Sequence, residues 1–291
     1  MSATDTPGDS AAFCADLVRG HDFARYASTL FVPAAERRAL LALYAFNVEI
    51  FRVRYQVTQS LPGEIRFQWW TDTLAGQGHG GVEGNPVAAE LASAIRNFHL
   101  PAAPLVRLIE EHQFDLYNDP MPNMAALESY LTATYSALFT LAAKIAAKIA
   151  APPSEAIDHL SHHAGLAQGL AQVIANLPRD ASRQQLFVPQ ELLERHGTGQ
   201  EQVFAGKQTP ALRAAFADLV GEAERHLATA LSLLGEVPAE VRPVFLPLAL
   251  VRRDLARLSR ADTDPFVPQS TSRLRTLWTL WRASRSKEFV R

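Results

Sequence analysis

The sequence predicts an all-helical protein folded as a single domain, and three observations support that prediction. Strand signals are nearly absent, because the chain contains no alternating runs of β-branched residues and no Asn-Gly or Asp-Gly hairpin turns. Apolar residues recur with helical spacing along most of the chain, interrupted by proline and glycine. No change in composition marks a boundary between two domains.

Composition narrows the class of protein. The 291 residues are 48% hydrophobic and 20% charged, which is ordinary for a chain that buries a large core. A formal net charge of −2 argues against a nucleic-acid ligand, which usually requires a basic face. The single cysteine, Cys14, excludes a disulfide framework and a thiolate zinc site, so we interpret it as a bystander in a reducing, cytoplasmic compartment.

The chain divides into a lead-in, a helical domain and a C-terminal segment. Residues 1–12 are small and acidic and lack the basic start and apolar core of a secretion signal, so we expect a disordered lead-in. The helical domain is expected over residues 13–265. Its longest apolar run, 135–151, is interrupted by Lys144 and Lys148, which favours a core helix over a membrane span and places both lysines on a solvated edge.

The helices expected in the first half are separated by prolines and glycines. The first follows Pro33, and it carries Leu40, Leu43 and Tyr44 on one face. The glycine-rich stretch 76–84 is expected to be a flexible loop. We expect helices over residues 33–55, 64–74, 86–98, 104–117 and 124–150.

The helical pattern continues through the second half. A helix over 155–177 follows the N-cap residue Ser154, and its many alanine and glycine residues allow close packing against neighbouring helices. Pro189 leads a short helix. We expect the last long pair over residues 210–234 and 238–259.

The C-terminal segment, residues 266–291, has a different character. Spacing of i, i+3, i+4 and i+7 gives one apolar stripe made of Leu274, Leu277, Trp278 and Trp281. Six basic residues against one acidic residue give the segment a net charge of +5, excluding the terminal carboxylate. Either this basic amphipathic helix lies at the boundary of an anionic membrane, or it docks on the domain with its basic side in water. The candidate membrane contacts are Trp278, Trp281, Arg275, Arg282 and Arg285.

Four groups of residues occur in a characteristic order: Arg37 with Leu43-Tyr44-Ala45-Phe46, Trp69-Trp70 with Asp72, Phe114-Asp115-Leu116 with Leu127-Glu128-Ser129-Tyr130, and Leu186-Phe187-Val188-Pro189. Together they resemble the squalene/phytoene synthase family over roughly residues 20–260. The resemblance implies the isoprenoid-synthase fold, a single-domain bundle of antiparallel helices around a central cavity. It also implies the family's reaction in isoprenoid biosynthesis, in which a transferase condenses two prenyl diphosphates head to head.

The family's reaction depends on two aspartate-rich motifs that hold Mg²⁺ against the diphosphate. Asp-x-x-x-Asp places two carboxylates one helical turn apart on the same face, and Mg²⁺ bridges them to phosphate oxygens. At the positions of the first motif the chain has Phe51, Arg52 and Tyr55. None of these binds Mg²⁺ in the usual way, because a phenol stays protonated near neutral pH.

The second motif corresponds to residues 176–180, where Asn176 replaces the first aspartate and Asp180 survives. We expect Pro178 to end or kink the helix and to move Asp180 off the stripe that faces the cavity. The arginines near both motifs add positive charge that would bind a phosphate directly, without a metal. They are Arg52, Arg54 and Arg179.

These replacements leave no residue that we assign to catalysis. A rebuilt metal site from Glu49, Asp115 and Asp180 is conceivable, with Asp180 as the weak metal candidate, although the spacing does not specifically call for it. We expect no cofactor, with Mg²⁺ implied only if transferase activity persists. The candidate cavity residues are Tyr44, Asn47, Glu49, Arg52, Asp72, Asp115, Asn176 and Asp180.

A narrower resemblance fits the replaced aspartates. The runs Ala45–Ile50, Arg66–Trp70 and His163–Gly169 resemble the divergent branch of this family that contains the mitochondrial complex I assembly factor, whose members also lack the aspartate motifs. The resemblance implies a non-catalytic protein at the inner face of the cytoplasmic membrane. Its partner would be a subunit or assembly intermediate of the respiratory NADH:quinone oxidoreductase (complex I).

The alternative is an active prenyl transferase that binds prenyl diphosphates or an isoprenoid lipid. We favour the non-catalytic hypothesis, because ionising a diphosphate without clustered metals needs a compensation that the sequence does not provide.

Three other groups have structural interpretations. His162 and His163 are adjacent, so their imidazoles cannot share a helix face, and ordinary surface or core histidines are favoured over a metal pair. His112 and Asp115 are spaced i, i+3 and are expected to form a structural hydrogen bond. The pair Trp69-Trp70 is expected in the core.

Overall fold

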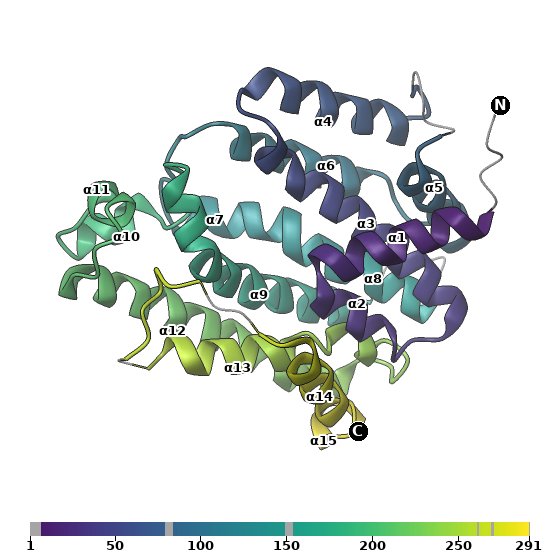
Figure 1. Ribbon diagram of the computed structural model, residues 1–291. Coiled ribbons are helices and arrows are strands. Elements are labelled where there is room, and N and C mark those ends of the chain that lie inside the picture. Colours follow the sequence, from purple (N-terminus) through teal and green to yellow (C-terminus); the bar gives the residue numbers. More distant parts are fainter. Residues whose placement is uncertain (1–6, 79–83, 149–153, 261, 269–270, 291) are drawn as a thin grey trace.

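The computed structural model describes residues 7–78, 84–148, 154–260, 262–268 and 271–290, and within these ranges it contains helices and turns but no strand (Figure 1). The prediction of an all-helical fold is therefore confirmed for the described residues. One hydrophobic core contains buried residues from Cys14 near the start of the chain to Phe289 near its end.

The elements follow one another in chain order. The first half contains α1 (Pro7–His21), α2 (Phe23–Thr29), α3 (Ala34–Gln56), α4 (Ser60–Leu74), α5 (Pro86–Phe98), α6 (Ala103–His112), the 3₁₀ turn η1 (Gln113–Leu116), α7 (Met124–Leu131), the π-helical turn η2 (Thr132–Ser136) and α8 (Ala137–Ala147). The second half contains α9 (Glu155–Ser182), α10 (Gln190–Arg195), α11 (Gln200–Phe204), α12 (Pro210–Leu233), the 3₁₀ turns η3 (Leu234–Glu236) and η4 (Arg242–Phe245), α13 (Leu248–Leu258), α14 (Arg273–Ala283) and α15 (Lys287–Val290).

Helix α9 occupies the middle of the bundle, where it packs on α12, η2 and α8 (Figure 1). On the other side, α3 packs on α1 and α5. The predicted close packing of the glycine-rich helix is confirmed, because Gly165 on α9 lies so close to the backbone of Ser136 that no side chain fits, and Gly169 lies against the side chain of Leu131. This contact brings the α7–α8 segment onto α9 and sets the position of the cavity between them.

The predicted helix over residues 124–150 was wrong in two respects. It is interrupted by η2, and it ends at Lys148, whose φ of 53° is left-handed. The prediction of a solvated lysine edge was wrong for Lys144, which is buried, whereas the side chain of Lys148 is 65% exposed while it forms an ion pair with the buried carboxylate of Glu36. Periodicity alone cannot distinguish a lysine in water from one that reaches a buried partner.

The helix predicted over 238–259 begins later than expected. Pro243 and Pro247 confine the first part to the short turn η4, and the helix proper, α13, starts at Leu248. Residues 7–12, which we expected in a disordered lead-in, belong to α1, whereas residues 1–6 lie outside the described part of the chain.

The predicted loop at 76–84 is described only in part, because residues 79–83 lie outside the described ranges. Among the described residues, no helix is long and apolar enough to cross a membrane.

Cys14 provides the first testable prediction. Its side chain is 2% exposed under α3 and α5, and burial raises the pKa of its thiol to about 12. Because the thiolate is the reactive form, we expect the native protein to react far more slowly with a disulfide reagent at mildly alkaline pH than the protein unfolded in guanidinium. Rapid, stoichiometric labelling of the native protein would contradict this prediction.

Candidate functional site

A cavity of about 480 Å³ lies between α2, α3, α8 and α9, and it is the candidate site. Its wall combines aromatic and apolar side chains with polar groups that converge from different helices. The lining residues are His21, Asp22, Ala24, Arg25, Asn47, Val48, Phe51, Arg52, Tyr55, His112, Thr134, Tyr135, Leu138, Gln168, Gln172 and Arg179. Three guanidinium groups and one carboxylate give this wall a net charge of +2 with neutral histidines, which suits an anionic ligand.

The positions of the family's first aspartate motif face this cavity, but they do not carry carboxylates. Phe51, Arg52 and Tyr55 all line it. The guanidinium of Arg179 lies 4.0 Å from the ring centroid of Tyr55 and 5.5 Å from that of Phe51. Aromatic rings and a cation therefore stand where the resemblance implies metal ligands.

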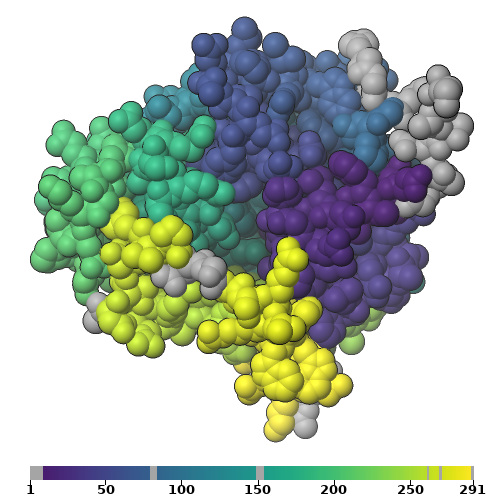
Figure 2. All heavy atoms as spheres, in the orientation of Figure 1, coloured from purple at the N-terminus to yellow at the C-terminus, as the bar shows by residue number. Residues whose placement is uncertain are grey.

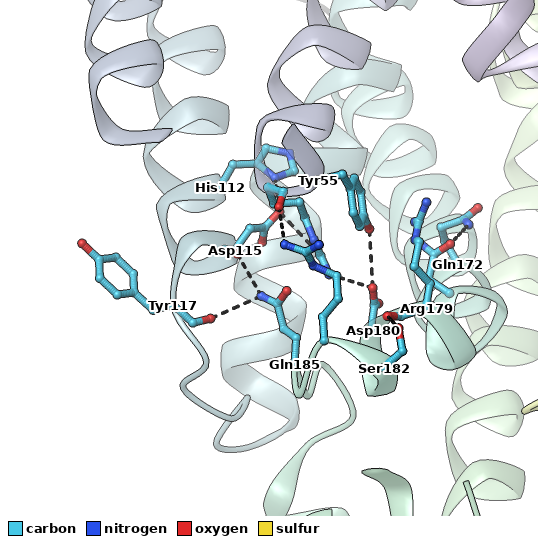
Figure 3. A network of polar contacts seen from close by, with 12 residues as sticks. Tyr55, His112, Asp115, Tyr117, Gln172, Arg179, Asp180, Ser182 and Gln185 are labelled. Carbon is cyan, nitrogen blue, oxygen red and sulfur yellow. Dashed lines mark hydrogen bonds and ion pairs between the residues drawn. The ribbon is translucent and has the colours of Figure 1, made fainter. Parts of the chain in front are cut away.

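Arg54 lies between Asp115 and Asp180, two of the aspartates that survive from the family's pattern. Its Nη2 atom is 2.7 Å from Oδ1 of Asp180, and its Nη1 atom is 3.8 Å from Oδ2 of Asp115. The three side chains are at most 6% exposed. Asp115 is also held by Nδ1 of His112 at 2.8 Å and by the hydroxyl of Tyr130, which donates at 2.9 Å. We call these five residues the Arg54 network; Figure 3 shows Asp115 on one side of it and Asp180 on the other.

In the Arg54 network, the buried carboxylate of Asp180 interacts with a positive charge and a hydrogen-bond donor of the chain itself. Burial raises the pKa of Asp180, and the charges of Arg54 and Arg179 oppose that shift. Burial also raises the pKa of Tyr55, so its phenol keeps its hydrogen and donates to Asp180 Oδ1 at 3.4 Å (Figure 3). The carboxylate oxygens that would bind Mg²⁺ are thus already occupied by a guanidinium and a phenol, which are positive and neutral hydrogen-bond donors.

The candidate cavity residues from the sequence fall into two groups. Asn47 and Arg52 line the cavity. Tyr44 is buried, with the guanidinium of Arg25 at 5.5 Å from its ring centroid. Asp115 and Asp180 belong to the Arg54 network.

The other candidates make contacts elsewhere. Glu49 interacts electrostatically with Cys14 and His21. Of the three residues of the conceivable metal site, Asp115 and Asp180 lie together at Arg54, and Glu49 lies apart from them. Asp72 accepts a hydrogen bond from Gln68 on the same helix at 2.7 Å. Asn176 accepts one at 3.0 Å from Gln172, which lines the cavity, so Asn176 lies behind the cavity wall.

The expectation that Pro178 would end the helix was wrong, and Asp180 is not among the described residues that line the cavity. Helix α9 continues through Pro178 to Ser182, and Asp180 remains 4% exposed in contact with Arg54. Pro178 removes one intrahelical hydrogen bond, the one that a backbone N–H at this position would donate to the carbonyl of Ile174, and the helix continues for one more turn despite that loss.

Sequence reasoning missed two arginines. From the sequence, Arg54 is only one of several added positive charges, and nothing singles out Arg25. Arg25 is buried, pairs with Asp22 at 2.8 Å and donates to Gln168 at 3.3 Å. Only the spacing of Asp22 and Arg25 at the start of α2 could have suggested that pair.

Residues outside the cavity follow the sequence predictions more closely. Ring contacts place Trp70 in the core, 5.1 Å from Phe46, with Trp69 partly buried beside it. His162 and His163 both lie near His226, because Nδ1 of His163 meets Nδ1 of His226 at 2.8 Å and the ring centroid of His162 is 6.4 Å from that of His226. Burial and the neighbouring imidazoles lower the pKa of His163 to about 4, so its ring is neutral at physiological pH.

The C-terminal helix α14 docks through a different face from the predicted apolar stripe. Thr276, Leu280 and Ala283 are buried. From the stripe itself, Leu274 is 80% exposed and Trp278 is 59% exposed. In Figure 2 this segment forms the yellow protrusion at the lower edge of the molecule.

The remaining candidate contacts of α14 surround these apolar side chains. Trp281 is 38% exposed and stacks on Trp278 with ring centroids 4.9 Å apart. The guanidinium of Arg285 lies 4.0 Å from the Trp281 centroid, and Arg275 and Arg282 are exposed on the same helix. Both interpretations of the segment are compatible with this geometry, since the helix is docked and three side chains of its apolar stripe, Leu274, Trp278 and Trp281, are exposed, whereas Leu277 packs against the core.

Comparison with known proteins identifies a protein family and a group of similar named proteins. A model of the squalene/phytoene synthase family matches residues 18–282. The chain is 32% identical over 270 residues to "NADH dehydrogenase (ubiquinone) complex I, assembly factor 6" of Rattus norvegicus and 30% identical to the protein of that name in Homo sapiens. Each alignment covers 92% of this chain and 80% of the relative.

Solved structures that resemble this chain include squalene and dehydrosqualene synthases. A squalene synthase, HpnC, from Alicyclobacillus acidocaldarius superposes with a TM-score of 0.72 at 21% identity, covering 86% of this chain and 93% of that one. A ligand-bound dehydrosqualene synthase gives a TM-score of 0.79 at 14% identity and covers 96% of both chains. At these identities the likeness establishes the fold.

Proposed function

The chain belongs to the squalene/phytoene synthase family, and from that premise we propose that it is a non-catalytic member that assists assembly of the respiratory NADH:quinone oxidoreductase at the membrane surface. The relatives that match nearly its whole length carry the name of a complex I assembly factor. The partner is a subunit or assembly intermediate of that complex.

The Arg54 network is the observation that carries this proposal. A prenyl transferase must gather Mg²⁺ on its carboxylates to stabilise a departing diphosphate. Here Asp115 and Asp180 are both paired with a buried arginine of the chain itself. A Mg²⁺ ion would have to displace that guanidinium from a site with almost no solvent exposure and would leave a buried, unpaired arginine behind.

The same cavity remains suited to an apolar ligand with an anionic head. Arg52 and Arg179 both line it, and the aromatic rings of Phe51 and Tyr55 lie beside Arg179, whose charge also acts on the buried Asp180. An isoprenoid lipid or prenyl diphosphate would be bound for recognition, with no ionisation step and no catalytic cofactor. Mg²⁺ belongs only to the transferase alternative, which these observations do not favour.

The first test is genetic. Deleting the gene should lower the amount of fully assembled NADH:quinone oxidoreductase, measured by in-gel activity after native electrophoresis, and the wild-type gene should restore it. Other respiratory complexes serve as the internal control. Unchanged amounts of the assembled complex in the deletion strain would overturn the proposal.

The second test is enzymatic. Purified protein incubated with farnesyl or geranylgeranyl diphosphate and Mg²⁺ is expected to release no diphosphate and form no C30 or C40 product, because no clustered metal stabilises the leaving group. An active squalene synthase in the same buffer is the positive control. Product formation that disappears in Asp180→Ala would establish the alternative function.

The exposed face of α14 supports a peripheral position on an anionic membrane. Two stacked tryptophans and a leucine project from a helix whose neighbouring charges are positive. Tryptophan favours the interfacial region of a bilayer, and arginine is attracted by anionic headgroups. Helix α14 also packs on α2, which lines the cavity, so docking through α14 would bring the cavity close to the lipid surface.

Binding to lipid vesicles tests whether α14 contacts an anionic membrane. We expect the protein to sediment with vesicles that contain anionic lipid and the double variant Trp278→Ser/Trp281→Ser to bind at least about tenfold more weakly, because both the buried apolar area and the aromatic anchors are lost. Added salt should weaken the binding of the wild type.

A matched control uses Leu61 and Ile65 on α4, which are each 62% exposed but lie on another surface. The variant Leu61→Ser/Ile65→Ser is expected to bind vesicles like the wild type. Equal losses in both variants, or no binding of the wild type to anionic vesicles, would argue against α14 as the contact.

A further inference from the structure

A second cluster of polar side chains lies outside the cavity, where α9 packs between α7 and α12. It includes His159 and His163, one turn apart on α9, Glu222 and His226, one turn apart on α12, and Glu128 on α7. The ring of His162 on α9 also lies beside His163 and His226. The ligand atoms of Glu128, Glu222 and His226 all lie within 4.8 Å of one another. His226 is 6% exposed, and both glutamates are partly buried.

We propose that Glu128, Glu222 and His226 bind a divalent transition-metal ion of the zinc class. One imidazole nitrogen and two carboxylate oxygens, with water in the fourth position, form a donor set that Zn²⁺ accepts. Tetrahedral coordination at ordinary Zn²⁺ distances places ligand atoms about 3.3–3.5 Å apart. Since Nε2 of His226 and Oε1 of Glu222 are 3.1 Å apart, small side-chain rotations complete the site.

The hydrogen bonds of the cluster fix which nitrogen would bind the ion. A carboxylate only accepts, so Nε2 of His226 carries a hydrogen toward Glu222. Nδ1 of His226 must then accept from Nδ1 of His163 at 2.8 Å, and Nε2 of His163 accepts from Nε2 of His159 at 3.2 Å. The three rings form one directed chain that ends on Glu222.

An ion at Nε2 of His226 would reverse the direction of these hydrogen bonds, and the three rings would stay in contact. The ion replaces the hydrogen on Nε2, the ring carries its hydrogen on Nδ1, and that nitrogen donates to His163. Histidines that bind metals usually donate from the second nitrogen to a partner that fixes the ring. His163 is that partner here, and His159 accepts the hydrogen bond from its other nitrogen.

Charge in the cluster also favours a cation. Glu128 and Glu222 approach within 4.8 Å, where two carboxylates repel each other. Among the described residues, Arg225 already pairs with Glu222, but its side chain is 65% exposed. An exposed pair of this kind is weak, so Arg225 can return to water when an ion binds. The ion would tie α7 to α12 across α9.

Zinc titration of the full-length protein, with any affinity tag removed and metal stripped by a chelator, tests the proposal. We expect one Zn²⁺ per chain by calorimetry and a higher Tm on Zn²⁺ addition, while Mg²⁺ in the same assay leaves Tm unchanged. Glu128→Gln and His226→Gln should each weaken the affinity at least about tenfold, and His163→Gln should weaken it by about 10–100-fold through loss of the supporting hydrogen bond.

The matched control is His196→Gln. His196 pairs with Asp218 of α12 at 2.8 Å, which is an ordinary surface pair of histidine and carboxylate. Zn²⁺ binding that survives in Glu128→Gln and His226→Gln, or that disappears in His196→Gln, would show adventitious binding and overturn the proposal. Co²⁺ gives a test that needs no variant, since a four-coordinate site produces strong visible absorption bands, and their absence in the wild type would also overturn it.

Discussion

Replacing Arg54 with methionine is expected to lower the free energy of unfolding by about 3–5 kcal/mol, the range typical of removing one partner from a buried ion pair. Methionine occupies a comparable volume, but it leaves Asp115 and Asp180 buried without the cation between them. Arg54 is 4% exposed, so water cannot easily take its place.

The loss should depend on pH in a defined direction. Burial already raises the pKa of Asp180, and removing Arg54 removes a charge that opposes that shift. In the variant the folded state therefore holds a proton on this carboxyl to a higher pH than the unfolded state does. The destabilisation should be largest at neutral pH and above, and it should shrink as the pH falls through the folded pKa and the carboxyl becomes neutral.

Denaturant unfolding followed by circular dichroism, at neutral and at mildly acidic pH, measures both effects. The control is Arg52→Met, two residues away on α3, because Arg52 lines the cavity and is only partly buried. We expect its unfolding free energy to change by less than about 1 kcal/mol. Adding Asp115→Asn and Asp180→Asn to Arg54→Met should recover part of the loss, because no buried charge then remains. Equal losses for Arg54→Met and Arg52→Met would refute the central role of Arg54.

The helical fold could be predicted because it rests on local signals. Apolar spacing and prolines gave α5 (Pro86–Phe98) at its observed bounds, and α12 within one residue. The signals failed where tertiary contacts decide the structure. The turn η2 (Thr132–Ser136) interrupts a sequence with good helical periodicity because it must fit against Gly165, which lies on another helix.

The degenerate metal site could be predicted in part. The sequence shows that aspartates are replaced at Phe51, Arg52 and Tyr55, because the order of the family's motifs identifies these three positions. What Arg54 does was not visible, since its partner Asp180 is 126 positions away in the chain. The cluster around His226 is hidden for the same reason. Its two i, i+4 pairs are present in the sequence, but only the packing of α9 on α12 brings them together.

Gly165→Ala is the second substitution with a large expected effect. A Cβ atom at this position would lie 2.2 Å from Oγ, 2.3 Å from the backbone nitrogen and 2.4 Å from Cα of Ser136. Two of these are backbone atoms of η2, so the segment itself must move away from α9 and break the hydrogen bond from Ser136 Oγ to the carbonyl of His162, now 2.9 Å long. We expect a loss of about 3 kcal/mol or more in unfolding free energy, at the upper end of overpacking costs.

Two other glycines in long helices separate this steric effect from the ordinary effect of alanine in a helix. At Gly169, one turn later on α9, the Cβ would meet only the tip of the Leu131 side chain, at 2.5 Å, which can rotate, so the loss should be smaller. At Gly221 on α12 nothing lies within 4 Å, and alanine should stabilise the protein by up to about 1 kcal/mol through its higher helix propensity. The three variants, compared by denaturant unfolding, should therefore rank from strongly destabilised to stabilised in the order Gly165, Gly169, Gly221. If Gly165→Ala proved as stable as Gly221→Ala, the contact between α9 and η2 could not be as close as described, and the position of the cavity wall that depends on it would be wrong.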